Sequence, residues 1–154
     1  MDRQWLDGIL SGVPSPMVMI GADNLIFAAN PAAEAILETS QIGRHHAIAL
    51  RQPALLAAIE VALRDRVAGQ ARYVIHGPSH EVTYLVAVTP VSGTGKSGAL
   101  CAFQDITEQE LIGQLRRDFV ANVSHELRTP LTALAGFIET LKGCLLYTSP
   151  SPRD

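Results

Sequence analysis

Three neighbouring side chains of a predicted helix could carry out a group-transfer reaction. His125 and Glu126 are adjacent, and Thr129 follows one helical turn after His125. A neutral imidazole is a competent nucleophile and can hold a transferred group as a covalent intermediate. A carboxylate beside the ring can accept its proton or orient it through a hydrogen bond. Taken alone, Glu126 is also typical of a solvated helix charge and Thr129 of a surface threonine, so the residue types leave both interpretations open.

The helix that would position these residues carries an apolar seam. Its members recur at a spacing of 4-3-4-3: Leu127, Leu131, Leu134, Ile138 and Leu141. This heptad pattern predicts packing against a partner helix. At about 100° per residue, His125 lies roughly 120–180° away from Leu127, Leu131 and Leu134. The spacing therefore predicts an exposed His125 and disfavours a satisfied core histidine.

The start of this helix and a bend within it are also predicted. Thr107 and Glu110 form the capping-box pattern T-x-x-E, which places the helix start after Asp105. Pro130 has no N–H, and its ring clashes with the carbonyl of Glu126. We therefore expect a kink beside His125.

The preceding hundred residues predict an α+β domain. The expected elements are a helix over 4–10, strands over 17–20 and 25–29, a helix that opens at Asn30-Pro31, a loop over 39–50, a helix that opens at Pro53 and is ended by Gly69, and strands over 72–76, 82–88 and 99–104. Leu56, Ile59 and Leu63 would line the buried face of the second of these crossover helices. An antiparallel sheet with helices on one face is the packing that this order favours.

Two segments resemble known families. Phe119–Phe137, FVANVSHELRTPLTALAGF, resembles the H-box of the histidine kinase dimerisation (HisKA) domain, and HELRTPL is its most specific part. Residues from about Leu10 to the D-I-T motif at Asp105–Thr107 resemble a PAS domain. Residues 50–53 (LRQP) and 116–132 (RRDFVANVSHELRTPLT) look most like the phosphate-regulon type of sensor kinase.

The resemblance implies roles for the candidate residues. His125 would be autophosphorylated from ATP and pass the phosphoryl group to an aspartate of a response regulator. Glu126 would be the base of the kinase step, and Thr129 would help to place the water that dephosphorylates the regulator. The complete protein would be a homodimer built on a four-helix bundle, with ATP and Mg as its substrates. The competing interpretation is a non-enzymatic PAS module that only dimerises through its last helix.

The same resemblance predicts a domain organisation. Residues 1–105 would be a PAS-like sensor domain, and 106–143 a signalling helix with a truncated HisKA phosphoacceptor helix. Residues 144–154, CLLYTSPSPRD, are identified as a sequencing-adapter artefact that breaks the helix. The second bundle helix and the ATP-binding domain are expected to be missing, which would leave an acceptor without a donor. Neither haem nor flavin is expected, because 53–67 has no histidine and the reactive-cysteine run of flavin-binding members is absent.

Composition and the remaining motifs exclude other classes of function. With 47% apolar residues and a net charge of −3, the chain is neither disordered nor suited to bind nucleic acid. Cys101 and Cys144 are too few for a disulfide framework or a zinc site. The paired histidines at 45–46 and at 76 and 80 lack a supporting cluster, so no metal site is expected. Residues 95–97 (GKS) lack the upstream glycine of a phosphate-binding loop.

The chain also predicts a location. No segment is long and apolar enough to span a bilayer, and no signal peptide is evident. We expect a cytoplasmic protein, with a membrane anchor only in a longer parent.

Overall fold

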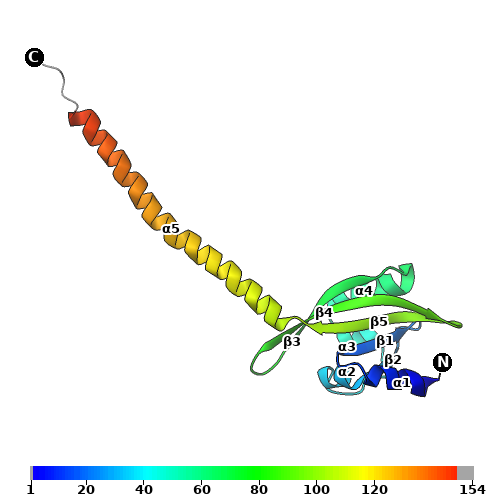
Figure 1. Ribbon diagram of the computed structural model, residues 1–154. Helices are drawn as coiled ribbons and strands as arrows, with labels where there is room; N and C mark the ends of the chain where they lie inside the picture. The colour runs from blue at the N-terminus through cyan, green and yellow to red at the C-terminus, as the bar shows by residue number, and fades with distance from the viewer. Residues whose placement is uncertain (1, 149–154) are drawn as a thin grey trace, which may run out of the picture. The chain divides into compact units, whose positions relative to one another are not determined.

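The computed structural model describes the backbone of residues 2–148 and the side chains of residues 2–144. The chain forms two compact units that divide between Glu108 and Gln109. The first unit contains a sheet with its helices, and the second consists of most of one long helix (Figure 1). The two units are described separately.

The first unit is built on a five-stranded antiparallel sheet. Its strands are β1 (Met17–Gly21), β2 (Ile26–Ala29), β3 (Gly69–His76), β4 (Glu81–Gly93) and β5 (Lys96–Asp105). The spatial order is β2-β1-β5-β4-β3. The helices between β2 and β3 form the crossover from one edge of the sheet to the other. The predicted antiparallel α+β arrangement is confirmed.

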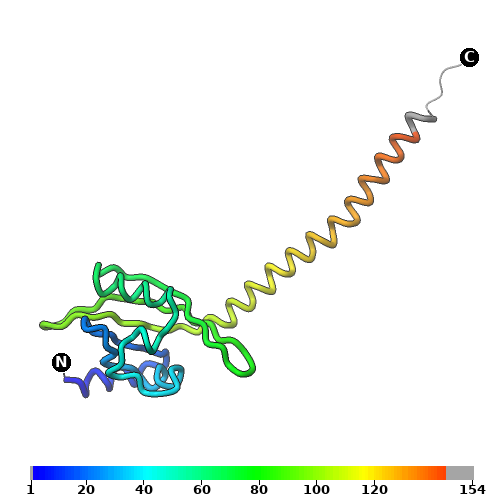
Figure 2. The backbone as a smooth tube through the Cα atoms, turned by 180° about the vertical axis from the view of Figure 1, so that it is seen from behind, coloured from blue at the N-terminus to red at the C-terminus, as the bar shows by residue number. Residues whose placement is uncertain are grey.

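Four helices belong to the first unit: α1 (Arg3–Ser11), α2 (Pro31–Ile36), α3 (His46–Leu50) and α4 (Pro53–Asp65). The longest of them, α4, packs on β3, β4 and β5 and runs along the sheet in both ribbon and tube views (Figures 1 and 2). Leu55, Ile59 and Ala62 are its buried residues. The predicted face was shifted by one position for two of its three members, since Leu56 and Leu63 are only partly buried.

Asn30 is the N-cap of α2, at the position where this helix was predicted to open, and it joins the first elements of the unit. Its Oδ1 accepts hydrogen bonds from the N–H groups of Ala33 (3.0 Å) and Met17 (2.8 Å). Its Nδ2 donates to the carbonyls of Val13 (3.1 Å) and Ser15 (2.7 Å). This buried amide therefore joins the start of β1 to the start of α2.

Two predictions about the crossover were wrong. The predicted loop over 39–50 contains α3, which begins where the Nδ1 of His45 accepts a hydrogen bond from the Ala47 N–H at 3.2 Å. Gly69 does not end α4 but opens β3. The helix ends at Asp65, and the residue that caps it, Arg66, has a left-handed φ of 58° and a guanidinium that donates to the carbonyls of Gly98 and Val91. These hydrogen bonds stabilise a conformation that glycine ordinarily supplies.

The long helix α5 (Thr107–Thr148) starts where it was predicted to start, but by a different cap. The Thr107 hydroxyl lies inside the helix, accepts a hydrogen bond from the Thr83 N–H and donates to Asp105 Oδ1. Asp105 Oδ1 also accepts the Thr107 N–H at 2.9 Å. The acceptor at the helix start is therefore the Asp105 carboxylate, in the local geometry typical of aspartate before a helix.

The helix is continuous through Pro130. It also continues past Gly143 to Thr148, so the expected break at Cys144 was wrong. Residues 144–148 contain no proline, so each of them can donate its N–H to the helix. Of the segment identified as an artefact, residues 149–154 lie outside the described residues. Within residues 2–148, no helix meets the length and hydropathy needed to cross a bilayer.

Candidate functional site

The second unit places the predicted site residues on one uninterrupted helix. His125, Glu126 and Thr129 all lie on α5, and all three side chains are exposed. Side chains of a helix lean toward its N-terminus, so Thr129 leans over the turn that carries His125. The structure thus brings His125 and Thr129 onto one face, with Glu126 about 100° further round.

The His125 imidazole is accessible and free to react. Among the described residues it has no hydrogen-bond or ion-pair partner. Within the same part of the chain no three metal-ligating side chains gather, at His125 or elsewhere. A ring in this environment offers a nitrogen lone pair to a substrate without first breaking an internal contact.

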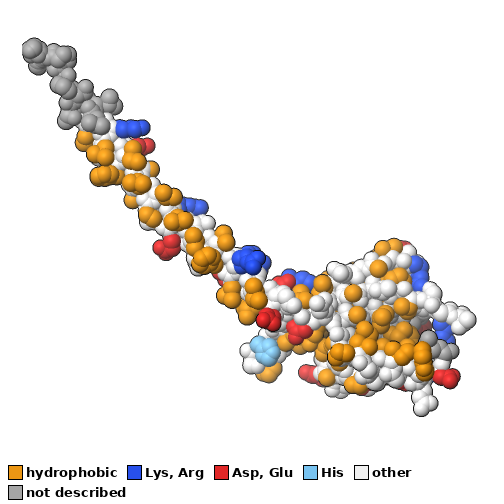
Figure 3. Space-filling model, viewed as in Figure 1, with side chains coloured by type: hydrophobic (Ala, Val, Ile, Leu, Met, Phe, Trp, Pro, Cys, Tyr) orange, Lys and Arg blue, Asp and Glu red, His pale blue; other side chains and the backbone are white. Residues whose placement is uncertain are grey.

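Every residue of the apolar seam on α5 is exposed to solvent. Its members are more than 40% accessible to solvent: Leu127, Leu131, Leu134, Ile138 and Leu141. Further exposed apolar residues precede it on the same helix: Leu111, Ile112, Leu115, Phe119 and Val120. Figure 3 shows these side chains as an apolar surface that runs along α5. An apolar surface of this extent on one helix marks an interaction site.

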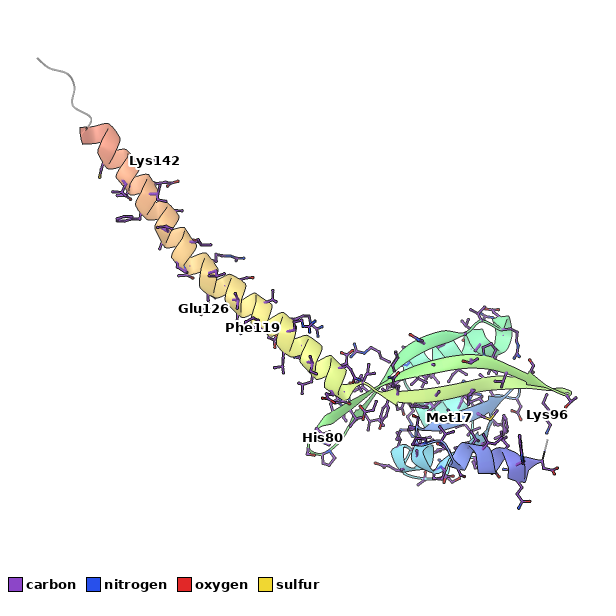
Figure 4. The ribbon with its side chains drawn as sticks, viewed as in Figure 1. Met17, His80, Lys96, Phe119, Glu126 and Lys142 are labelled. Atoms are coloured by element: carbon purple, nitrogen blue, oxygen red, sulfur yellow. The ribbon has the colours of Figure 1, made fainter. Side chains whose placement is uncertain are left out.

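The side of α5 that carries His125 differs from the seam. Asp118 and Thr132 lie seven residues before and after His125, which is about 20° away from it around the axis. Both are exposed, and the side chains of α5 stand out into open space along its length (Figure 4). The helix therefore has an apolar side suited to a partner helix and another side on which His125 is exposed among polar residues.

The interior of the first unit is occupied by its own side chains. The Phe103 ring lies edge-on to the rings of Tyr73 and Tyr84, with centroids 5.6 and 6.0 Å apart. Cys101 is fully buried on β5, and burial raises the pKa of its thiol to about 12. A thiol with so high a pKa is not a reactive nucleophile.

Two residues that hold elements of the first unit together were not predicted from the sequence. Thr83 is buried on β4 and contacts Thr107, and the Gln52 side chain binds Val74 of β3. No local signal marks Gln52, because its side chain makes no cap hydrogen bond to α4 and its partner Val74 is 22 residues away. Nothing in the alternating pattern of β4 distinguishes Thr83 from its neighbours.

Comparison with known proteins identifies the helical segment. Residues 115–150 match the His Kinase A (phospho-acceptor) domain. The chain is 55% identical over 47 residues to the phosphate regulon sensor protein PhoR of Pseudomonas aeruginosa, and 57% identical over 44 residues to the sensor histidine kinase WalK of Bacillus subtilis. These matches cover 30% and 29% of this chain but only 11% and 7% of the relatives. The predicted similarity to the phosphate-regulon type is present, and the similarity to WalK is of the same degree.

Solved structures identify the fold of the first unit. The PAS domain of nitrogen regulation protein NR(II) from Vibrio parahaemolyticus superposes with a TM-score of 0.52 at 18% identity, covering 66% of this chain and 97% of that one. The PAS domain of Bordetella pertussis BvgS gives 0.54 at 15% identity, covering 77% and 96%. At these identities the likeness establishes the fold alone. The chain thus combines a domain of the PAS fold with a helical segment that matches the His Kinase A (phospho-acceptor) domain.

Proposed function

We propose that this chain serves two-component signal transduction by accepting a phosphoryl group on His125 and passing it to a response regulator. The observation that carries the proposal is the match of residues 115–150 to a phosphoacceptor domain, with His125 exposed on the side away from the seam. ATP with Mg²⁺ is the proposed donor, bound by the catalytic part of the kinase. A ring nitrogen attacks the γ-phosphorus, the bond to ADP breaks, and the ring proton leaves.

The neighbours of His125 have distinct proposed roles. Glu126 accepts the ring proton in the kinase step, because a carboxylate on the adjacent residue needs only a rotamer change to reach the imidazole. Thr129 acts in the dephosphorylation of the regulator, where its hydroxyl orients the water that attacks the phosphoryl group. Positioning supplies most of the catalysis in phosphoryl transfer, so each residue acts chiefly through its place on the helix.

The seam supports a homodimer. A heptad of leucine and isoleucine is typical of helices that pack in bundles, and two copies of α5 would cover each other's apolar side while leaving His125 accessible. The PAS-fold domain (1–105) would bias the conformation of the helix that follows it. We further propose a cytoplasmic location for both parts. A response-regulator receiver domain is the proposed acceptor of the phosphoryl group.

Replacement of His125 tests the proposal in the intact kinase. With radiolabelled ATP, His125→Gln should lose all label on the protein while keeping the dimeric mass in sedimentation. His80→Gln is the matched control, since His80 is an exposed histidine at the β3–β4 hairpin (Figure 4). Retention of label in the His125 variant would refute the acceptor role, and signalling unchanged by the substitution would favour the non-enzymatic module.

The present chain alone should not label itself. Among the described residues, Gly95-Lys96 was the segment considered as a phosphate-binding loop. It lies at the turn of the β4–β5 hairpin. We expect no label when the chain is incubated with radiolabelled ATP, and label on His125 when the catalytic domain of a matching kinase is added. Label without added kinase would contradict this expectation.

A further inference from the structure

A line of hydrogen bonds crosses the first unit from the start of α4 to the start of α5. It begins at Gln52, whose side-chain amide binds the edge strand β3 at both ends. The Val74 N–H donates to Gln52 Oε1 at 2.9 Å, and Gln52 Nε2 donates to the Val74 carbonyl at 2.5 Å. The amide therefore occupies the edge of β3 as a neighbouring strand would.

The line continues through the residue paired with Val74. In the β3–β4 register Val74 lies opposite Thr83, which is buried. The Thr83 N–H donates to Thr107 Oγ1 at 3.0 Å, and the Ile106 N–H donates to the Thr83 carbonyl at 2.8 Å. Because the N–H groups of Val74 and Thr83 both have partners on their outer sides, the two form a non-hydrogen-bonded pair, in which side chains approach most closely.

The residues at both ends of this line of hydrogen bonds are fixed by neighbouring contacts. At one end, Gln52 lies between Leu50 and Leu55, which are both fully buried in the core. At the other end, the Thr107 hydroxyl donates to Asp105 Oδ1 at 2.6 Å. That hydrogen bond and the one from the Thr107 N–H lower the pKa of Asp105 and keep its carboxylate ionised as an acceptor. The Gln52 amide thus connects the start of α4 to β3.

We propose that this line makes the first turn of α5 depend on the seating of α4 against the sheet. If α4 moves, Gln52 releases Val74, the β3 edge loosens, and Thr83 weakens its hold on Ile106 and Thr107. The two states are a docked and a frayed first turn, and local openings of this kind are within reach of helix ends. By linkage the coupling is reciprocal, so loss of the Thr107 contact must loosen Gln52. The relevance of the coupling to signalling rests on the proposed kinase function, but the coupling itself does not.

Amide hydrogen exchange tests the proposal, because Val74, Thr83 and Ile106 each donate one N–H to a bond of the line. In Gln52→Ala, we expect exchange at all three to accelerate by about fivefold or more relative to the core amides of Val86 and Cys101. Gln70→Ala is the matched control, an exposed glutamine on β3 itself, and should leave the ratios unchanged. Acceleration at Val74 alone, or an equal rise at the core amides, would overturn the proposal.

A second variant tests the coupling from the other end. Thr107→Val removes the acceptor of the Thr83 N–H and should accelerate exchange at Val74, which Thr107 does not touch, while Thr107→Ser should restore it. No change at Val74 in Thr107→Val would overturn the coupling. The measurement needs no ATP. If the exchange rates did not change as expected, the predicted labelling of His125 would be unaffected. If His125 were not labelled, the expected exchange ratios would be unaffected.

Discussion

At the scale of single residues, Asn30 joins separate backbone segments of the first unit through its side chain. Four hydrogen bonds to backbone groups converge on its buried amide. Asn30→Ala leaves the buried N–H groups of Met17 and Ala33 without this acceptor, at a cost of about 3 kcal/mol. For a domain of this size that lowers the Tm by about 15 °C. Thermal unfolding followed by circular dichroism would measure it.

The exposed Asn122 on α5 offers a control for this prediction. Asn122→Ala removes the same amide from a solvated helix position and should leave the melting of the sheet domain unchanged. Equal melting temperatures for the two variants would show that the Asn30 bonds are replaced by others.

His46 should make the first unit sensitive to acid. Burial lowers the pKa of His46, and the stacked ring of His45, 4.7 Å away, acts in the same direction. The hydrogen bond to the Asn24 carbonyl opposes both. Because the folded pKa lies below the unfolded one, the stability is fully present above about pH 6.5 and is lost as the pH falls from there toward the folded pKa.

The measurement is the Tm between pH 7.5 and 5. The wild-type chain should lose stability over this range, whereas His46→Gln should lose less because glutamine does not titrate. His80→Gln, at an exposed hairpin position, should follow the wild type. If the His46 and His80 variants gave the same pH dependence, the acid sensitivity would have another source.

At the scale of elements, the seam of α5 is the feature that most needs a partner. Leu134 is 54% exposed in a position that a heptad would bury. A lysine there loses the burial of one leucine, worth about 2.7 kcal/mol, in each of the two chains, so the dimerisation constant should fall by about 10,000-fold. We therefore expect Leu134→Lys to shift the chain from dimer to monomer in sedimentation equilibrium. Thr132→Lys, two residues away on the His125 side, should remain dimeric, and dimers of equal strength in both variants would exclude the seam as the interface.

Pro130 gives α5 a local weakness five residues after His125. The helix is continuous there, but the Glu126 carbonyl has no N–H of residue 130 to accept. Pro130→Ala supplies that N–H and removes the ring clash, which stabilises the helix by about 3 kcal/mol. Hydrogen exchange of the amides over 126–134 should slow in the variant. Unchanged exchange would show that the proline costs the helix nothing and that the expected bend has no basis.

At the scale of the whole molecule, the parts predicted best from the sequence were those fixed by local patterns. Alternating apolar residues predicted β4, and Asn30-Pro31 predicted the start of α2. The HELRTPL run identified the phosphoacceptor segment. The predictions that were wrong concern helix ends that are set by contacts between residues distant in the sequence. Arg66 ends α4 in a left-handed conformation because β4 and β5 supply acceptors for its guanidinium.

The helix start shows the same limit. A T-x-x-E pattern at Thr107 predicts a local cap, but the Thr83 N–H, 24 residues away, competes for the hydroxyl and the Asp105 carboxylate takes the capping role. No spacing rule contains that pairing, because it depends on the register of β4 against β5. The roles of His125, Glu126 and Thr129 remain predictions, since an exposed helix position fixes no contact that would test them.

The two units should also unfold separately. The first buries an apolar core of its own, while the described side chains of α5 from residue 114 onward are all exposed. An isolated helix gains its stability from packing, so α5 should melt with its dimer and the PAS-fold unit with its core. We expect two transitions in the helical circular dichroism signal, of which the α5 transition rises in temperature with protein concentration and the other does not. Leu134→Lys should lower only the concentration-dependent transition, and Asn30→Ala only the other one. A single transition shifted by both variants would contradict the independence of the units, because then the core contacts and the seam would be stabilising one cooperative structure.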